Sequence, residues 1–156
     1  EMDYLILGNV QVEPRNTAVT PLIRFTIPNL LSNIGYDIYA VFAPAIASDT
    51  LATDTLPLKV KFSLKYNDQD GRQVNDIKME NPEGGTYVYE TTPNVVDTIL
   101  VARDYKIPTC SYGLSEPQVR LTVESDRGTA SKYTRILRLD CIVFKPHEDD
   151  NNVSNE

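Results

Sequence analysis

His147 is the only histidine among the 156 residues of the chain, so any site that needs an imidazole must use it. A Ser-His-Asp or Cys-His site requires a general base held rigidly within hydrogen-bond reach of its nucleophile. His147 follows Pro146 and precedes a polar, acidic end of the chain, and chain termini are usually mobile. We therefore interpret His147 as a surface histidine without a catalytic role. Zinc needs several His or Cys ligands, so neither a zinc site nor another cofactor is expected.

The 22 Asp and Glu residues could serve two kinds of site. A glycosidase needs only a pair of carboxyl groups, so a hydrolase with paired carboxylates stays open as an alternative. Asp68 and Asp70 precede Gly71 as in part of a calcium loop. An EF-hand alignment on that glycine puts Tyr66 and Ile77 at the first and last ligand positions, which excludes the motif. We interpret the segment as a hairpin turn, and Asp68 and Asp70 remain calcium candidates if another loop supplies further ligands.

Tyrosine is the most promising residue type for recognition, because it combines an apolar ring with a polar tip. Of the nine tyrosines, Tyr87 and Tyr89 are predicted to share one face of a strand, and Tyr105 and Tyr112 to lie in loops. These four residues, with the loop Ala45–Thr55, are our candidates for ligand binding. The chain has no Trp, which argues against a carbohydrate-stacking platform. The alternative is that the tyrosines cover half-exposed positions at the edge of a sheet.

The two cysteines, Cys110 and Cys141, are too few for a disulfide framework and lack the spacing of a metal site. Cys141 lies in a strand pattern with Leu139 and Val143, which favours a buried free thiol. A disulfide between Cys110 and Cys141 is the alternative, and it would require an oxidising compartment.

Composition and charge exclude several classes of protein. Hydrophobic residues make up 41% of the chain and charged residues 24%, as in an ordinary globular domain. With 15 basic and 22 acidic residues the net charge is −7, so nucleic acid is not an expected partner. Apolar runs stay well below the ~20 residues that span a bilayer, so no transmembrane segment is predicted. We expect one domain over residues 1–146 and a flexible acidic tail over residues 147–156.

The elements that must position these residues are strands, because side chains alternate between apolar and polar at every step. Ten prolines and many β-branched residues argue against helices. Two segments that are apolar on both faces, Tyr36–Ala43 and Val95–Ala102, are predicted to be central strands. Further strands are predicted near residues 5–12, 23–27, 60–66, 74–79, 86–91, 119–124 and 137–143.

The order of strands and turns predicts the fold class. Residues 59–66, the turn 67–71 and the polar strand after it form the clearest hairpin. The connection Ala43–Pro57 is predicted to cross from one sheet to the other. About eight or nine short strands then predict an antiparallel β-sandwich of jelly-roll or Greek-key type.

Three segments resemble a known family. Ser131–Pro146 resembles the closing strand of galactose-binding-like jelly rolls, which often end in an Arg-Ile-Asp-x-Ile-x-Leu-x-Pro type of sequence. With Leu31–Pro44 and Cys110–Gly113, the chain looks like the C-terminal β-sandwich module of Bacteroides-type surface lipoproteins, often found after a fasciclin-like domain. The resemblance covers Leu22 to Pro146 and carries over no catalytic residue.

This resemblance implies an exported protein that is lipid-anchored at the outer membrane, beside a nutrient importer made of a transporter and a substrate-binding lipoprotein. The chain has no lipobox cysteine near its start and no fasciclin segment, so we expect an excised C-terminal domain. The expected function is that of a non-catalytic surface module for protein–protein contact or adhesion, accessory to the importer. A carbohydrate-binding module that takes a glycan and a hydrolase are the alternatives.

Overall fold

The computed structural model describes residues 4–12, 20–27, 34–44, 56–67, 70, 72–93, 95–107, 119–126, 132–134 and 136–149. These residues form nine strands and no helix. The strands are β1 (Tyr4–Val12), β2 (Leu22–Thr26), β3 (Gly35–Phe42), β4 (Lys59–Asn67), β5 (Gln73–Lys78), β6 (Tyr89–Glu90), β7 (Asp97–Lys106), β8 (Arg120–Ser125) and β9 (Leu137–Pro146).

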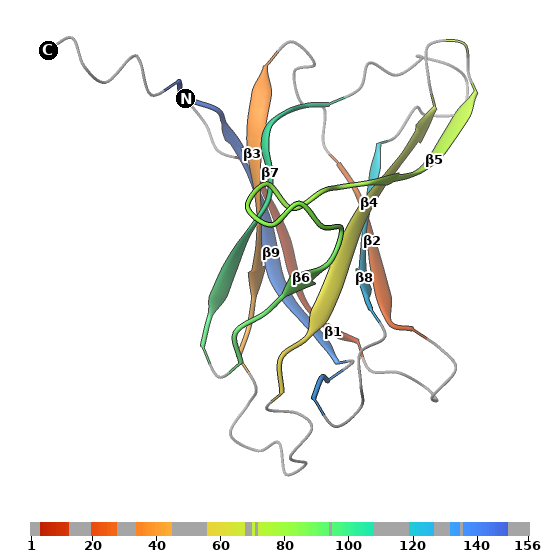
Figure 1. The fold of residues 1–156 in the computed structure, drawn as a ribbon. Helices are drawn as coiled ribbons and strands as arrows, with labels where there is room; N and C mark the ends of the chain where they lie inside the picture. Colours follow the sequence, from red (N-terminus) through yellow and green to blue (C-terminus); the bar gives the residue numbers. More distant parts are fainter. Residues whose placement is uncertain are drawn as a thin grey trace, which may run out of the picture.

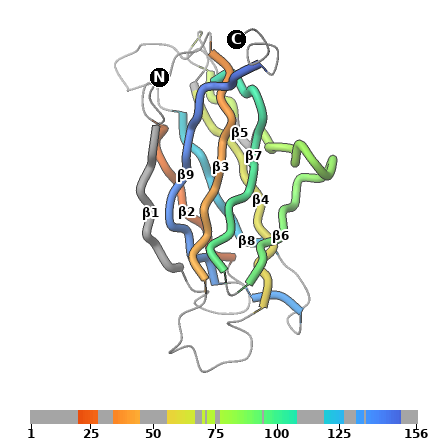
Figure 2. The backbone as a smooth tube through the Cα atoms, turned by 90° about the vertical axis from the view of Figure 1, so that its left-hand side faces the viewer, coloured from red at the N-terminus to blue at the C-terminus, as the bar shows by residue number. Residues whose placement is uncertain are grey.

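The strands form two antiparallel sheets, which confirms the predicted β-sandwich (Figure 1). The first sheet has the order β1-β9-β3-β7, and β9, β3 and β7 lie side by side in Figure 2. The second sheet has the order β2-β8-β4-β5, with β6 also pairing with β4. The chain passes from β3 in the first sheet to β4 in the second, so the predicted crossing connection is confirmed. The predicted hairpin is also confirmed, because β4 and β5 pair from Ser63–Lys78 to Asn67–Gln73.

The core lies between the sheets and follows the alternation of the sequence. In β4, Val60, Phe62 and Leu64 are at most 1% exposed, while the lysines between them are not buried. Ile38 in β3 and Leu121 in β8 are fully buried in the same layer. Burying each such side chain stabilises the fold by about 1.5–3 kcal/mol, which explains why the alternating segments form the strands.

The prediction of a central strand over Val95–Ala102 is wrong. The strand, β7, begins at Asp97 and is the last strand of the first sheet in the described part of the chain. Val95 and Val96 lie outside it and are 49% and 65% exposed. An apolar run on both faces is typical of a central strand, but here only the middle of β7 is buried.

The predicted face of Cys141 is also wrong, because β9 contains a bulge. Relative to β3, the register shifts between Val41–Cys141 and Phe42–Leu139, so Asp140 is an extra residue. A single extra residue moves all following side chains to the opposite face. Leu139 therefore lies in the core, whereas Cys141 is half-buried on the outer face. Cys141 is a free thiol, its pKa raised by burial and by the charge of Asp140, and Cys110 lies outside the described residues.

Candidate functional site

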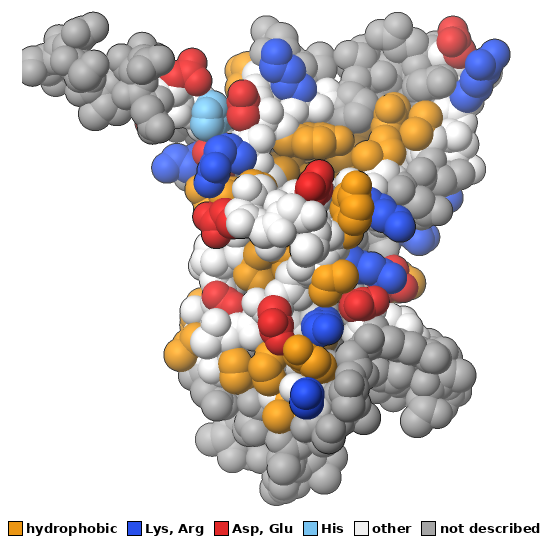
Figure 3. Space-filling model, in the orientation of Figure 1, with side chains coloured by type: hydrophobic (Ala, Val, Ile, Leu, Met, Phe, Trp, Pro, Cys, Tyr) orange, Lys and Arg blue, Asp and Glu red, His pale blue; other side chains and the backbone are white. Residues whose placement is uncertain are grey.

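A groove lies between the inner face of β7 and the connection from β5 to β6. Its volume is about 490 Å³, and we call it the Tyr105 groove. The two sheets diverge toward this part of the molecule (Figure 1), and hydrophobic side chains are visible in the recess between them in Figure 3. The groove is lined by Lys78, Met79, Glu80, Asn81, Pro82, Gly85, Ala102, Arg103 and Tyr105. Its size is within the range of about 300–1,000 Å³ that is usual for small-ligand sites.

The floor of the groove is apolar and its wall is aromatic. Met79 and Ala102 are 3% and 6% exposed, and Tyr105 is half-buried against the core. Burial raises the pKa of the Tyr105 phenol, and Tyr66 raises it further. The phenol therefore stays neutral at physiological pH and keeps both a ring face and a hydrogen-bond donor available.

Charged side chains of both signs stand at the rim. Arg103 Nη2 lies 3.8 Å from Glu83 Oε1, with the two side chains 53% and 72% exposed, so this ion pair contributes little to stability. Lys78 Nζ lies 5.8 Å from the centre of the Tyr87 ring, and Tyr87 is itself 48% exposed. The rim can therefore rearrange its charged groups around a ligand without a large loss of folding energy.

The connection on the other side of the groove is held by its own turn. The backbone N–H groups of Gly84 and Gly85 donate to the carbonyl of Asn81 at 3.3 and 3.0 Å, and Glu83 N donates to Asn81 Oδ1 at 2.9 Å. Asn81 N also donates to the carbonyl of Thr86 at 2.6 Å. Gly85 has a φ of 64°, which a glycine adopts without strain. This network gives the groove one fixed wall.

A bulge in β7 places the residues of the other wall. The register of β3 with β7 moves from Tyr36–Tyr105 to Ile38–Ala102, so two residues, Arg103 and Asp104, lie opposite one. In a regular strand, residues three apart point to opposite faces. Because of the extra residue, Ala102 and Tyr105 both line the groove. We call this feature the Asp104 bulge.

The Asp104 bulge is anchored by Asp37 and Gly35 of β3. Asp104 has a φ of 51° and donates its N–H to Asp37 Oδ1 at 2.9 Å. A Cβ at Gly35 would clash with the carboxylate of Asp104, so any larger residue there would force the exposed Asp104 side chain to move. Both residues of β3 are therefore needed for the local geometry of β7.

His147 joins this anchor and is partly buried. Its Nδ1 lies 2.9 Å from Asp37 Oδ1, and its backbone N–H donates to the carbonyl of Gly35 at 2.8 Å. Its Nε2 lies 3.7 Å from Asp149 Oδ1. The hydrogen bond with Asp37 raises the pKa of His147, and the charges of Asp37, Asp104 and Asp149 add to this effect, against burial, which lowers it. In Figure 3 the pale blue histidine lies between acidic side chains.

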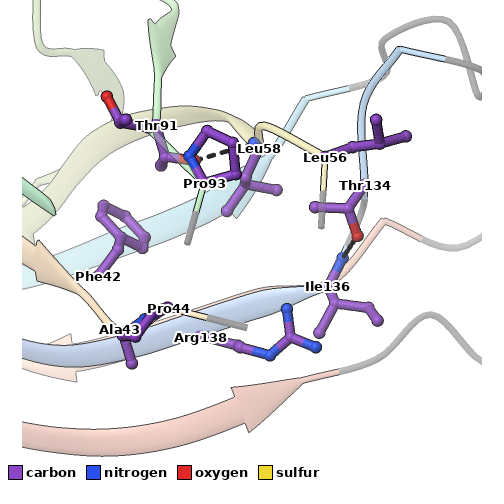
Figure 4. A pocket seen from close by; sticks show the side chains of 11 residues that line it. Phe42, Ala43, Pro44, Leu56, Leu58, Thr91, Pro93, Thr134, Ile136 and Arg138 are labelled. Carbon is purple, nitrogen blue, oxygen red and sulfur yellow. Dashed lines mark hydrogen bonds between the residues drawn. The ribbon is translucent and has the colours of Figure 1, made fainter. Parts of the chain in front are cut away.

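A second, smaller hollow lies where β3 ends and β4 begins (Figure 4). Two hydrogen bonds close it: Leu58 N donates to Thr91 Oγ1 at 2.9 Å, and Ile136 N to Thr134 Oγ1 at 3.2 Å. Its volume is about 30 Å³, which is room for about one water molecule. It is too small to hold an organic ligand.

The four candidate tyrosines have different positions. Tyr105 lies in β7 rather than in a loop, and it lines the groove. Tyr87 precedes the short strand β6 and lies beside Lys78 at the rim. Tyr112, like the loop 45–55, lies outside the described residues.

Tyr89 does not share a face with Tyr87, which corrects that prediction. It is 2% exposed, and its hydroxyl donates to the carbonyl of Val101 at 2.6 Å. Its ring packs edge-on against Phe62 with centroids 5.1 Å apart. Burial, with the charge of Glu80, raises its pKa far above the usual range. Tyr89 thus links the two sheets and offers no surface to a ligand.

Of the two calcium candidates, the structure describes only Asp70. Asp70 is exposed in the β4–β5 turn, and Asp68 lies outside the described residues. Within those residues, no group of three or more His, Cys, Asp or Glu side chains is placed to hold a metal ion.

Comparisons with known proteins give this chain no relative. No model of a protein family matches it, and neither do the curated proteins or the solved structures searched. Within the described residues, no helix has the length and apolar character needed to cross a membrane.

Proposed function

We propose that this chain is a non-catalytic binding module and that it holds its ligand in the Tyr105 groove. The observation that carries the proposal is the groove itself: a buried apolar floor, an aromatic wall and exposed charged groups at the rim. A mostly apolar pocket with a few polar groups is typical of small-ligand sites. Of the described residues that line the groove, Glu80 is the single carboxylate, so a hydrolase with paired carboxylates gains no support there.

The proposed setting is the surface of an outer membrane, where the module would belong to a lipid-anchored lipoprotein beside a nutrient importer. This part rests on the resemblance of segments such as Ser131–Pro146. It is tested by fractionating cells that make the full-length protein. Recovery in the inner membrane or the cytosol would contradict the setting but leave the groove proposal intact.

A protein partner that extends beyond the groove along β7 is the first candidate for the ligand. Val95 and Val96 form an exposed apolar pair directly before β7, and Arg103 near the other end of the strand is also exposed. Such residues suit contact with another protein surface. Affinity capture from solubilised outer membranes tests this candidate, with a Val96→Asp variant as control. Equal capture by both variants would remove this apolar pair from the interface.

A saccharide is the second candidate, and the composition of the groove favours it specifically. The half-buried ring of Tyr105 can stack on a sugar, while Arg103 and Glu80 offer planar polar groups at its edge. A glycan array followed by calorimetry tests this candidate. No signal above background across the array would eliminate it.

Substitution of Tyr105 tests whether the ligand binds in the groove or on another surface of the molecule. We expect Tyr105→Ala to weaken binding at least about tenfold, because aromatic side chains in partly buried pockets dominate contact energy. Tyr105→Phe keeps the ring and should retain most of the affinity for a stacked ligand. The matched control is Tyr133→Ala, because Tyr133 lies beside Lys59, away from the groove lining. Unchanged affinity in Tyr105→Ala, with the fold intact by circular dichroism, would overturn the proposal.

A further inference from the structure

We propose that Asp37 is a positioning residue for the Tyr105 groove, and that its pairing with His147 makes the position of Tyr105 depend on pH. The inference rests on the proposed function, because it concerns regulation of the same groove. Asp37 itself does not line the groove. It acts through the Asp104 bulge.

Asp37 connects three segments through one oxygen atom. Its Oδ1 accepts the N–H of Asp104 in β7 at 2.9 Å and lies 2.9 Å from Nδ1 of His147, just beyond β9. The backbone of His147 is fixed in turn by the carbonyl of Gly35, at the start of β3. The end of β9, the start of β3 and the Asp104 bulge therefore meet at one carboxylate.

The bulge needs this support because its backbone is unfavourable. A non-glycine residue with positive φ costs on the order of 1 kcal/mol, although Asp tolerates it better than most residues. The acceptor on Asp37 satisfies the amide of Asp104 in that conformation. If β7 relaxed to a regular strand, Tyr105 would turn away from the face of Ala102 and leave the groove. The hydrogen bond that stabilises the bulge therefore also keeps Tyr105 in the wall of the groove.

His147 makes this support sensitive to protons. A charged imidazole donates a stronger, charge-assisted hydrogen bond to Asp37 than a neutral one. The groups that favour the charged form are Asp37 on β3, Asp104 on β7 and Asp149 beyond β9, and they raise the pKa of His147. The strand register also places two exposed lysines nearby, Lys145 opposite Asp37 and Lys106 opposite Gly35.

The direction of the pH effect follows from the raised pKa of His147. The contribution of the ion pair is complete below the ordinary histidine pKa of about 6.5, and it is lost as the pH rises through the raised value. We therefore expect the bulge to be most firmly held in mildly acidic solution. As the pH rises from that range to 9, Asp37 loses the charge-assisted bond that ties it to the end of β9 but still offers its oxygen to the Asp104 amide, so the bulge should persist while the ring of Tyr105 shifts its position.

Nuclear magnetic resonance of the ligand-free protein tests the inference. In a titration from pH 5.5 to 9, we expect the Asp104 amide, the Tyr105 ring and the His147 ring to shift together with one midpoint above 6.5. His147→Gln should remove the shared transition. Asp37→Asn, which keeps an acceptor but no charge, should preserve the bulge and lose the transition, while Asp37→Ala should displace the Tyr105 ring at every pH.

The matched control is Asp140→Asn, which removes an exposed carboxylate from β9 away from this cluster and should leave the titration unchanged. The inference is overturned if Tyr105 does not titrate with His147, or if Asp37→Ala leaves the Tyr105 signals in place. Because no ligand is present, these outcomes are independent of the binding experiment. Normal titration with unchanged binding in Tyr105→Ala would contradict only the proposed function.

Discussion

At the residue scale, three tyrosines around the groove differ in their structural role because they differ in burial. Tyr105 is half-buried with its ring toward the groove, Tyr87 is exposed at the rim, and Tyr89 is enclosed in the core. The sequence predicted that tyrosines matter for recognition, and Tyr105 is the candidate that lines the groove. It could not separate Tyr89 from Tyr87, because two residues of equal type at a spacing of two indicate one face only if both lie in a strand. Here Tyr87 precedes the strand.

The hydroxyl of Tyr89 should contribute measurably to stability. We expect Tyr89→Phe to lower the free energy of unfolding by about 1 kcal/mol, because the buried carbonyl of Val101 loses its partner. Urea denaturation measures the change, with Tyr87→Phe as an exposed control near zero. Equal free energies of unfolding for the two variants would show that the hydrogen bond between the sheets makes no net contribution to stability.

At the element scale, bulges are the part of the fold that the sequence did not predict. Alternation located β2, β4 and β8 well, because those strands keep a period of two throughout. It misjudged β7 and β9, where extra residues shift the phase. The sequence of one strand does not show whether it contains an extra residue. A bulge is defined by how the strand pairs with its neighbour, and that pairing is not visible in the sequence of the strand alone. For the same reason the anchoring role of Asp37 was not predicted.

Gly35 gives a direct test of the Asp104 bulge as an element. We expect Gly35→Ala to destabilise the fold by about 1–3 kcal/mol, because the new methyl group meets the Asp104 carboxylate and lies 3.2 Å from its backbone carbon. Adding Asp104→Gly should restore much of the loss, since glycine removes the carboxylate and accepts a positive φ. Chemical denaturation of both variants provides the comparison.

The control for this pair is Gly84→Ala, where the nearest atom to a new Cβ is Asn81 Nδ2 at 3.3 Å and the site is exposed. A small effect is expected there. If Gly35→Ala were as mild as Gly84→Ala, the close approach of β3 to Asp104 would not constrain the strand.

At the scale of the whole molecule, the stability of the fold should depend on pH because of the Asp37–His147 pair. The chain has one histidine, so a transition near neutral pH has a single imidazole as its source. The two-layer architecture was predicted from composition and alternation, because burying one face of each strand requires a second sheet. The groove was not predictable, since it arises where the sheets diverge and the connection from β5 to β6 closes one side.

Thermal unfolding at several pH values tests this dependence. The raised pKa of His147 means that the native state binds the proton more tightly than the unfolded chain, so the stabilisation is largest at low pH. We expect the difference in Tm between the wild type and His147→Gln to be greatest near pH 5.5 and to vanish above the native pKa. A difference that grows with pH would contradict the ion pair.

Three register shifts also restrict how β3 can align with its neighbours, two against β7 and one against β9. β7 carries its extra residues opposite the first half of β3, and β9 carries its own near the last residues. Sliding by two positions would keep every side chain on its proper face, so hydrophobic patterning alone does not forbid that error. The bulges do forbid it, because each irregular point fits only one place along β3. Together these irregular points act against misaligned pairing while the sheet assembles.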